Sequence, residues 1–121
     1  MKKLLLLFLL VFVLIGCGGS ADISPSQAVK MMEEDPNIVL VDVRTYEEYI
    51  AEHIPNAILV PLATLESSAA SKIPDKDGTY FVYCRSGNRS ATAVSQLKSW
   101  GYQHVYDLGG IINWPYETIK G

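Results

Sequence analysis

The stretch Thr79-Tyr80-Phe81-Val82-Tyr83-Cys84-Arg85-Ser86-Gly87-Asn88-Arg89-Ser90 decides how this chain folds. Its aromatic and β-branched residues 79–83 are typical of a strand, which ends at Cys84. Beyond the loop, apolar residues recur at helical spacing from about residue 89 to residue 100, and this spacing predicts a helix. Cys84 therefore begins a short loop between a strand and the N-terminus of a helix.

Strand and helix patterns alternate on both sides of this stretch. Apolar, β-branched runs predict further strands over residues 38–43, 57–60 and 104–108, the last followed by a turn at Gly109-Gly110. Capping-box patterns predict helices over residues 25–34 and 46–52. Weaker patterns predict helices over residues 62–70 and, broken by Pro115, residues 111–119. The alternation predicts an α/β fold with a largely parallel central sheet flanked by helices.

The loop that follows Cys84 has the features of an anion-binding site. It leaves the carboxyl end of a strand, where ligands of parallel sheets bind, and leads into a helix N-terminus, which favours anions. Gly87 permits a tight curl of backbone N–H groups, and Arg85 and Arg89 add positive charge. These features favour a nucleophilic thiolate at Cys84. The alternative interpretation is that Cys84 is an inert core residue, as most buried cysteines are.

The N-terminus reads as a targeting segment. A basic start, Met1-Lys2-Lys3, precedes the entirely apolar run 4–15 and a small, polar region, which is the order of a secretory signal peptide. The apolar run is shorter than the ~20 residues that a membrane-spanning helix needs. A transmembrane anchor is therefore the weaker interpretation.

Leu14-Ile15-Gly16-Cys17 resembles the lipobox of bacterial lipoproteins. The resemblance implies cleavage before Cys17, lipidation of that cysteine and attachment to a membrane of the cell envelope, facing the periplasm or the outside of the cell. It divides the chain into a signal peptide (residues 1–16), a lipidated tether (17–23) and one domain (24–121). The alternative is an ordinary cleavable signal in which Cys17 has no special role.

Composition excludes several classes of function. The net charge of −3 gives no basic surface for nucleic acid. The two histidines and two cysteines are scattered without metal-ligand spacing, so we expect neither a metal site nor a cofactor. With Cys17 lipidated, Cys84 would be the only thiol in a compartment that favours disulfides.

The loop resembles the active-site loop of the rhodanese family, which begins with the catalytic cysteine. Three further segments resemble family landmarks in the expected order: Val41-Asp42-Val43-Arg44 with Glu48-Tyr49, His53-Ile54-Pro55-Asn56-Ala57, and Gly109-Gly110-Ile111 with Trp114. The resemblance covers about residues 24–121 and implies a small rhodanese-like domain.

In that family the cysteine takes a sulfane sulfur from a donor as a persulfide and passes it on. The resemblance implies that Cys84 is the catalytic nucleophile. It implies a substrate-binding loop made of Arg85, Ser86, Gly87, Asn88 and Arg89. The partners would be a small sulfur-containing anion as donor, such as thiosulfate, and cyanide or a thiol, including a protein thiol, as acceptor.

Two other functions remain open: a sulfur- or redox-sensing module without turnover, and a cysteine-dependent phosphatase. Arg89 lies one position too close to Cys84 to match the phosphate-binding arginine of such phosphatases. The loop also has no clear general acid for a leaving group.

Other polar residues have simpler interpretations. Asp42 and Arg44 favour a structural pairing at a strand end, and His53 favours a packing role. Glu47 and Glu48 are interpreted as a solvated helix face.

Overall fold

The computed structural model describes residues 21–121, so the predicted signal peptide and Cys17 lie outside the described residues. The helices are α2 (Pro25–Glu34), α3 (Tyr46–Ala51), α4 (Leu65–Lys72) and α5 (Asn88–Ser99), with short 3₁₀ turns η2 (Leu62–Thr64) and η3 (Ile111–Asn113). The strands are β1 (Val39–Asp42), β2 (Glu52–His53), β3 (Ile58–Leu59), β4 (Thr79–Cys84), β5 (His104–Gly110) and β6 (Ile119–Lys120).

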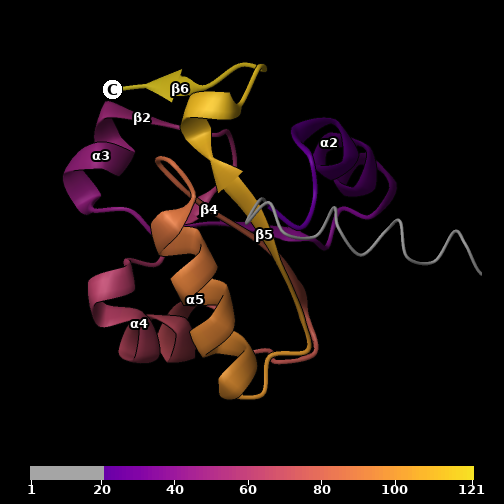
Figure 1. Cartoon of the computed structure of the whole chain (residues 1–121), viewed down its shortest axis with the longest axis vertical. Helices are drawn as coiled ribbons and strands as arrows, with labels where there is room; N and C mark the ends of the chain where they lie inside the picture. Colours follow the sequence, from indigo (N-terminus) through magenta and orange to yellow (C-terminus); the bar gives the residue numbers. More distant parts are fainter. Residues whose placement is uncertain (1–20) are drawn as a thin grey trace, which may run out of the picture.

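The central sheet has the strand order β3-β1-β4-β5, and every neighbouring pair is parallel. Helices cover both of its faces, with α4 and α5 on one side and α2 on the other (Figure 1). The predicted α/β fold with a parallel sheet flanked by helices is confirmed. Among the residues described, no helix is both long and apolar enough to span a membrane.

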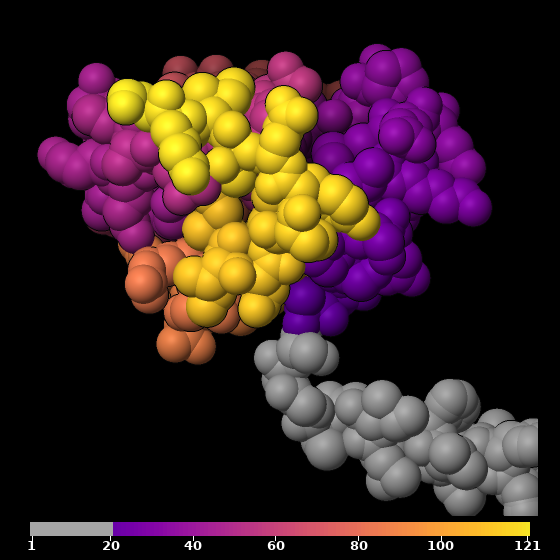
Figure 2. All heavy atoms as spheres, turned by 90° about the horizontal axis from the view of Figure 1, so that it is seen from above, coloured from indigo at the N-terminus to yellow at the C-terminus, as the bar shows by residue number. Residues whose placement is uncertain are grey.

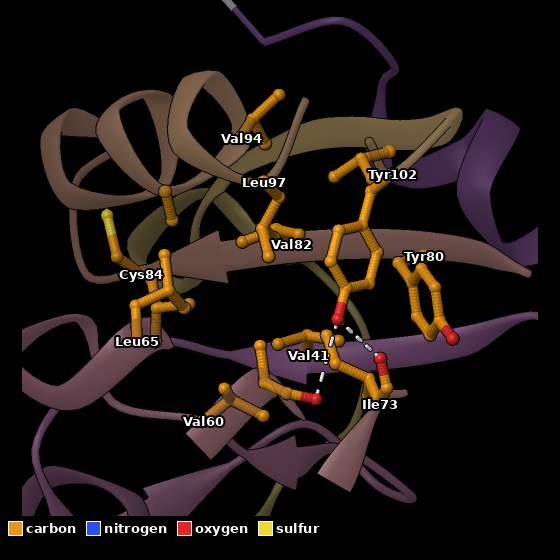
Figure 3. Packing of buried hydrophobic residues seen from close by; sticks show 14 residues of the cluster. Val41, Val60, Leu65, Ile73, Tyr80, Val82, Cys84, Val94, Leu97 and Tyr102 are labelled. Carbon is orange, nitrogen blue, oxygen red and sulfur yellow. Dashed lines mark hydrogen bonds between the residues drawn. The ribbon is translucent and has the colours of Figure 1, made fainter. Parts of the chain in front are cut away.

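The residues of β4 alternate between the two faces. Tyr80, Val82 and Cys84 pack into the core beneath α4 and α5 (Figure 3), whereas Phe81 and Tyr83 pack into the core beneath α2 and the C-terminal segment. This period of two is what a pleated strand imposes when both faces are buried. All residues of both cores lie within residues 21–121, so the domain has the interior it needs to fold on its own.

The two predicted capping boxes begin helices as expected. The Ser24 hydroxyl accepts the Gln27 N–H while the Gln27 side chain accepts the Ser24 N–H, and α2 follows. Thr45 and Glu48 form the same reciprocal pair at the start of α3. Each box satisfies backbone donors that would otherwise be unpaired, and thereby fixes where the helix starts.

The prediction of a helical C-terminal tail is wrong. Only the single 3₁₀ turn η3 forms, and the chain then extends into β6, which pairs antiparallel with β2. Pro115 explains the difference, because it lacks an N–H donor and restricts Trp114, which is extended with φ −84° and ψ 113°. Figure 2 shows the C-terminal segment, in yellow, lying across one face of the molecule between segments coloured magenta and indigo.

The prediction of a turn at Gly109-Gly110 is also wrong, because β5 continues through both glycines. Gly110 pairs with Cys84 in the sheet register, after a shift between Val82 and Tyr83. A Cβ at Gly110 would lie 2.7 Å from the Cα of Ser86. Gly110 therefore lets the end of β5 approach the backbone of the cysteine loop.

Candidate active site

The thiol of Cys84 is fully buried at the carboxyl end of β4. Its Sγ accepts hydrogen bonds from the backbone N–H of Gly87, at 3.0 Å, and of Ser90, at 3.3 Å. In Figure 3 the sulfur points from the strand toward the first turn of α5. Converging N–H groups of this kind form an anion-binding nest, and here they are aimed at a sulfur atom.

Gly87 gives the loop its curl, as the sequence predicts. It has a left-handed conformation, with φ 111° and ψ −15°, and it is the N-cap of α5. Residues with a side chain rarely adopt this conformation, whereas glycine does so without steric cost. The curl turns the Gly87 N–H back toward Cys84 and starts the helix directly behind the sulfur.

Behind the sulfur lies a buried polar pair formed by Ser90 and Asp107. The Ser90 hydroxyl lies 3.6 Å from Sγ of Cys84 and donates to Oδ1 of Asp107 at 2.7 Å. The same carboxylate oxygen accepts the N–H of Gly109 at 2.8 Å. Burial raises the pKa of Asp107, and its hydrogen bonds with Ser90 and Gly109 offset part of this increase.

An ion pair joins the loop to α3. The guanidinium of Arg89 donates to both carboxylate oxygens of Glu48, at 2.8 and 2.9 Å. The Arg89 contact is the largest cause that lowers the pKa of Glu48 to about 2; partial burial offsets some of the decrease, and hydrogen bonds from Thr45 add to it. The interpretation of Glu48 as part of a solvated helix face is therefore wrong, because its carboxylate fastens α3 to the first turn of α5.

The remaining loop residues lie at the surface. Arg85, Ser86 and Asn88 are exposed, and the carbonyl of Arg85 accepts the N–H of Ile112. Arg89 lies instead on the wall of a small cavity of about 240 Å³, whose other walls come from residues 43–45, which follow β1, and from residues 61–63 at η2. The loop thus presents one exposed cation and one that is paired beside a cavity.

The family model of the rhodanese-like domain matches residues 24–116. The chain belongs to the rhodanese-like domain family. The match agrees with the resemblance that the cysteine loop and the other landmarks indicate.

Two relatives of this rhodanese-like domain are named as thiosulfate sulfurtransferases. PspE of Escherichia coli (strain K12) is 38% identical over 81 residues, which are 67% of this chain and 78% of the relative. GlpE of Pseudomonas fluorescens is 34% identical over 104 residues, which are 82% of this chain and 92% of the relative. Such relatives support a sulfurtransferase activity in general.

Solved structures agree with the fold. A rhodanese with anions from E. coli superposes with a TM-score of 0.65 and 37% identity, over 69% of this chain and 99% of its own. A rhodanese-like domain protein from Staphylococcus aureus gives a TM-score of 0.69 with 34% identity, over 78% of this chain and 91% of its own. The domain alone therefore accounts for nearly all of a folded chain in a solved structure.

In this rhodanese-like domain, Asp42 and Arg44 form the structural pair that the sequence predicts. The guanidinium of Arg44 contacts both carboxylate oxygens of Asp42, with Nη2 to Oδ2 at 2.7 Å, and donates to the carbonyl of Glu52. Both side chains are buried, and the guanidinium lies over the Tyr83 ring. Burial alone would lower the pKa of Arg44, but the hydrogen bond and charge of Asp42 raise it.

The predicted packing role of His53 is also confirmed. Its ring stacks on that of Tyr49, with centroids 3.9 Å apart, and its Nδ1 lies 2.9 Å from the Tyr49 carbonyl oxygen. Among the residues described, no cluster of His, Cys, Asp and Glu could hold a metal ion.

Sequence reasoning did not assign Ser90, Asp107 or Glu48 to the site. Ser90 ends the quoted loop, and a site built on a helix N-terminus has its donors in the first helical turn, so Ser90 could have been found. Asp107 comes from β5, whose place beside β4 the sequence does not specify. Glu48 could not be found, because its partner lies 41 positions away in the chain.

Proposed function

We propose that this protein is a sulfurtransferase in which Cys84 carries sulfane sulfur as a persulfide. The observation that carries the proposal is the pair of backbone N–H groups, from Gly87 and Ser90, that converge on Sγ. A cradle of donors around a sulfur stabilises negative charge there, first on a thiolate and then on a persulfide.

The reaction proceeds by two displacements at sulfur. The Cys84 thiolate attacks the sulfane sulfur of thiosulfate; the new bond to Sγ forms as the sulfur–sulfur bond of the donor breaks, and sulfite leaves with the electron pair. A nucleophilic acceptor, cyanide or a thiolate, then attacks the terminal sulfur. The bond to Sγ breaks and returns its electron pair to Cys84, so no external oxidant or reductant is needed.

The positions of the charged residues support an anionic donor. Arg85 is exposed at the loop and has no ion-pair partner among the residues described, so its charge is free to attract an anion. Arg89 holds Glu48, and its role is therefore to brace the loop beside the small cavity. The substrate-binding roles of Ser86 and Asn88 remain predictions from the resemblance.

We also propose that Cys17 is lipidated and holds the domain at a membrane surface of the cell envelope. The sequence of the segment before Cys17 supports this placement. The domain's first described residues are attached to the sheet: Asp22 N–H donates to the Asp107 carbonyl at 2.7 Å, and Asp107 N–H donates to Asp22 Oδ2 at 2.8 Å.

The test uses residues 18–121, in which Cys84 is the only thiol. Mixing with thiosulfate should release one equivalent of sulfite per domain, and cyanide added afterwards should yield thiocyanate. Cys84→Ser should do neither. A sulfite burst without transfer to cyanide or to any thiol would favour the sensing module. Cleavage of phosphate esters without any sulfite burst would reject the proposal in favour of a phosphatase.

A further inference from the structure

The buried pair Ser90–Asp107 has no part in the sulfur-transfer steps above, yet it contacts the reacting atom. The thiol of Cys84 donates to the Ser90 hydroxyl oxygen at 3.6 Å, and the hydroxyl donates onward to Asp107 Oδ1 at 2.7 Å. Cys84 and Ser90 are fully buried, and Asp107 as a whole residue is 9% exposed. Three groups that can hold a proton thus form a continuous chain that runs from β4 through α5 to β5.

Only one of the three polar groups in contact with Sγ can accept a proton. Two of the polar contacts of Sγ are backbone N–H groups, which donate and cannot take a proton from the thiol. The third is the Ser90 oxygen. Its own proton has three acceptors, the carbonyl oxygens of Gly87 at 3.1 Å and Gly109 at 3.4 Å and Oδ1 of Asp107 at 2.7 Å, and the Asp107 carboxylate is the nearest of them. Among the contacts of the described residues, the thiol proton can therefore leave Sγ only through the hydroxyl of Ser90.

We propose that Ser90 and Asp107 take up the proton that Cys84 releases when its thiolate forms. The S–H bond breaks and an O–H bond forms at Ser90, while the Ser90 proton moves to Oδ1 of Asp107. The products are a thiolate and a neutral carboxylic acid. Ser90 then donates to the thiolate, which has three donors in place of two, and Asp107 donates to Ser90.

The surroundings of Asp107 suit a group that gains and loses a proton. Burial raises its pKa, and the nearby charge of Asp22 acts in the same direction. Asp107 also lines an open groove of about 570 Å³ between the N-terminal segment, the cysteine loop and the end of β5, so its proton can exchange with water there. Cys84 does not line this groove.

The charged groups that face the proton path come from three elements. Asp22, in the N-terminal segment, faces Asp107. Arg89 of α5 is close enough to Cys84 for the charge of Cys84 to contribute to the raised pKa of Arg89, after the larger effect of the hydrogen bond to its ion-pair partner Glu48 of α3. Removing the Asp22 carboxylate therefore changes the charge next to Asp107 without touching Ser90, which makes Asp22→Asn a matched control for Asp107→Asn.

The test follows the ultraviolet absorbance of the thiolate against pH in residues 18–121, taken as the difference from Cys84→Ser. In the wild-type domain the thiolate absorbance should rise in two steps, because Cys84 and Asp107 are coupled. The first step removes one proton and leaves a second one shared between Cys84 and Asp107. The second step removes that shared proton from a site that already carries one negative charge. Asp107→Asn keeps an oxygen that accepts the Gly109 N–H, but its side chain cannot take up a proton. Its thiolate absorbance should therefore rise in one step, at a pH below that of the second wild-type step. Asp22→Asn should retain two.

Variants at Ser90 separate the hydroxyl path from simple proximity. Ser90→Ala should lose the first step and reduce the thiolate fraction at neutral pH roughly tenfold, the effect of one lost hydrogen bond to a charged group. Ser90→Thr keeps the hydroxyl and should therefore show both the first titration step and the wild-type thiolate fraction. A single step in the wild-type domain, two steps in Asp107→Asn, or two steps in Ser90→Ala would each overturn the proposal.

The inference rests on the proposed reactivity of Cys84, but its test involves no sulfur donor. A titration that overturns the proton path while Cys84 still releases sulfite from thiosulfate leaves the proposed function intact. If the domain titrates as expected but never accepts sulfur, the proposed function is rejected, whereas the proposed proton path through Ser90 and Asp107 still holds.

Discussion

At the scale of single residues, Gly87 carries the conformation on which the sulfur cradle depends. Its φ of 111° places it in the left-handed region, and its N–H is the nearer of the two backbone donors to Sγ. Space is available for a methyl group there, since the nearest atom to an added Cβ is 3.9 Å away. The constraint is thus the backbone conformation rather than crowding.

Gly87→Ala should therefore lower the rate of sulfite release at least tenfold while costing about 1–2 kcal/mol of unfolding free energy. Gly101→Ala is the matched control, because Gly101 has a similar φ of 99° but lies beyond the other end of α5. Gly101→Ala should lose a similar amount of unfolding free energy and should release sulfite at the wild-type rate. Chemical denaturation and single-turnover kinetics measure the two quantities. Equal rates in both variants would show that the curl at Gly87 is not needed for transfer.

The site residues that could be predicted from the sequence are those that act on near neighbours in the chain. The cysteine, the glycine curl and the structural role of Asp42 with Arg44 follow from local patterns, because each acts over a few positions of the chain. Asp107 and Glu48 act across the fold. Their places at the site depend on which strands pair and how α3 packs, and a local pattern does not contain that information.

At the scale of elements, the Arg89–Glu48 pair ties α3 to the start of α5. The pair is only partly exposed, at 36% and 28% of the two side chains, and it has bidentate geometry. Glu48 also caps α3 through Thr45. One carboxylate therefore fixes both a helix start and the distance between α3 and the loop.

This pair predicts a specific pH dependence of stability. The folded-state pKa of Glu48 is lowered from 4.5 to about 2, so its contribution is fully present above pH 4.5 and is lost as the pH falls through 2. Glu48→Gln should cost about 1 kcal/mol at neutral pH, and the difference from wild type should shrink across that window. Denaturation at a series of pH values measures it.

Glu47→Gln provides the control, because Glu47 stands in the same helical turn and forms no ion pair in the described domain. Its effect should be small and flat with pH. A difference for Glu48→Gln that stays constant from neutral pH down to pH 2 would contradict the assignment of the lowered pKa to the Arg89 contact.

Elements also show why the C-terminal segment escaped prediction. Residues 111–119 have an apolar pattern that fits a helix, but Pro115 interrupts it, and β2 offers a pairing edge instead. Strand β2 is two residues long and leaves no recognisable pattern of its own. Strands β2 and β6 form only because they pair with each other, so neither can be predicted before the fold brings the two segments together.

At the scale of the whole molecule, the domain's N-terminal segment docks on β5 beside the cysteine loop. Between Cys17 and Ala21 lie only three residues, Gly18, Gly19 and Ser20. Cys17 is thus four residue steps from Ala21, and four steps reach at most about 14 Å. A lipid on Cys17 would therefore hold the Cys84 end of the sheet close to the membrane surface.

Cys17→Ser in the full chain should abolish incorporation of labelled palmitate and shift the protein out of the membrane fraction. The rate of sulfite release by the full chain should not depend on this change, because each polar contact of Sγ among residues 21–121 comes from within the domain. Palmitate incorporation that persists in Cys17→Ser would contradict the assignment of the lipid to that residue.

Intact-mass spectrometry shows whether Cys84 carries sulfur as a persulfide. Residues 18–121 treated with thiosulfate should gain the mass of one sulfur atom, lose it on addition of cyanide or a thiol, and show no gain in Cys84→Ser. An unchanged mass with thiosulfate and other sulfane donors, or a gain that survives in Cys84→Ser, would show that Cys84 is not a persulfide carrier.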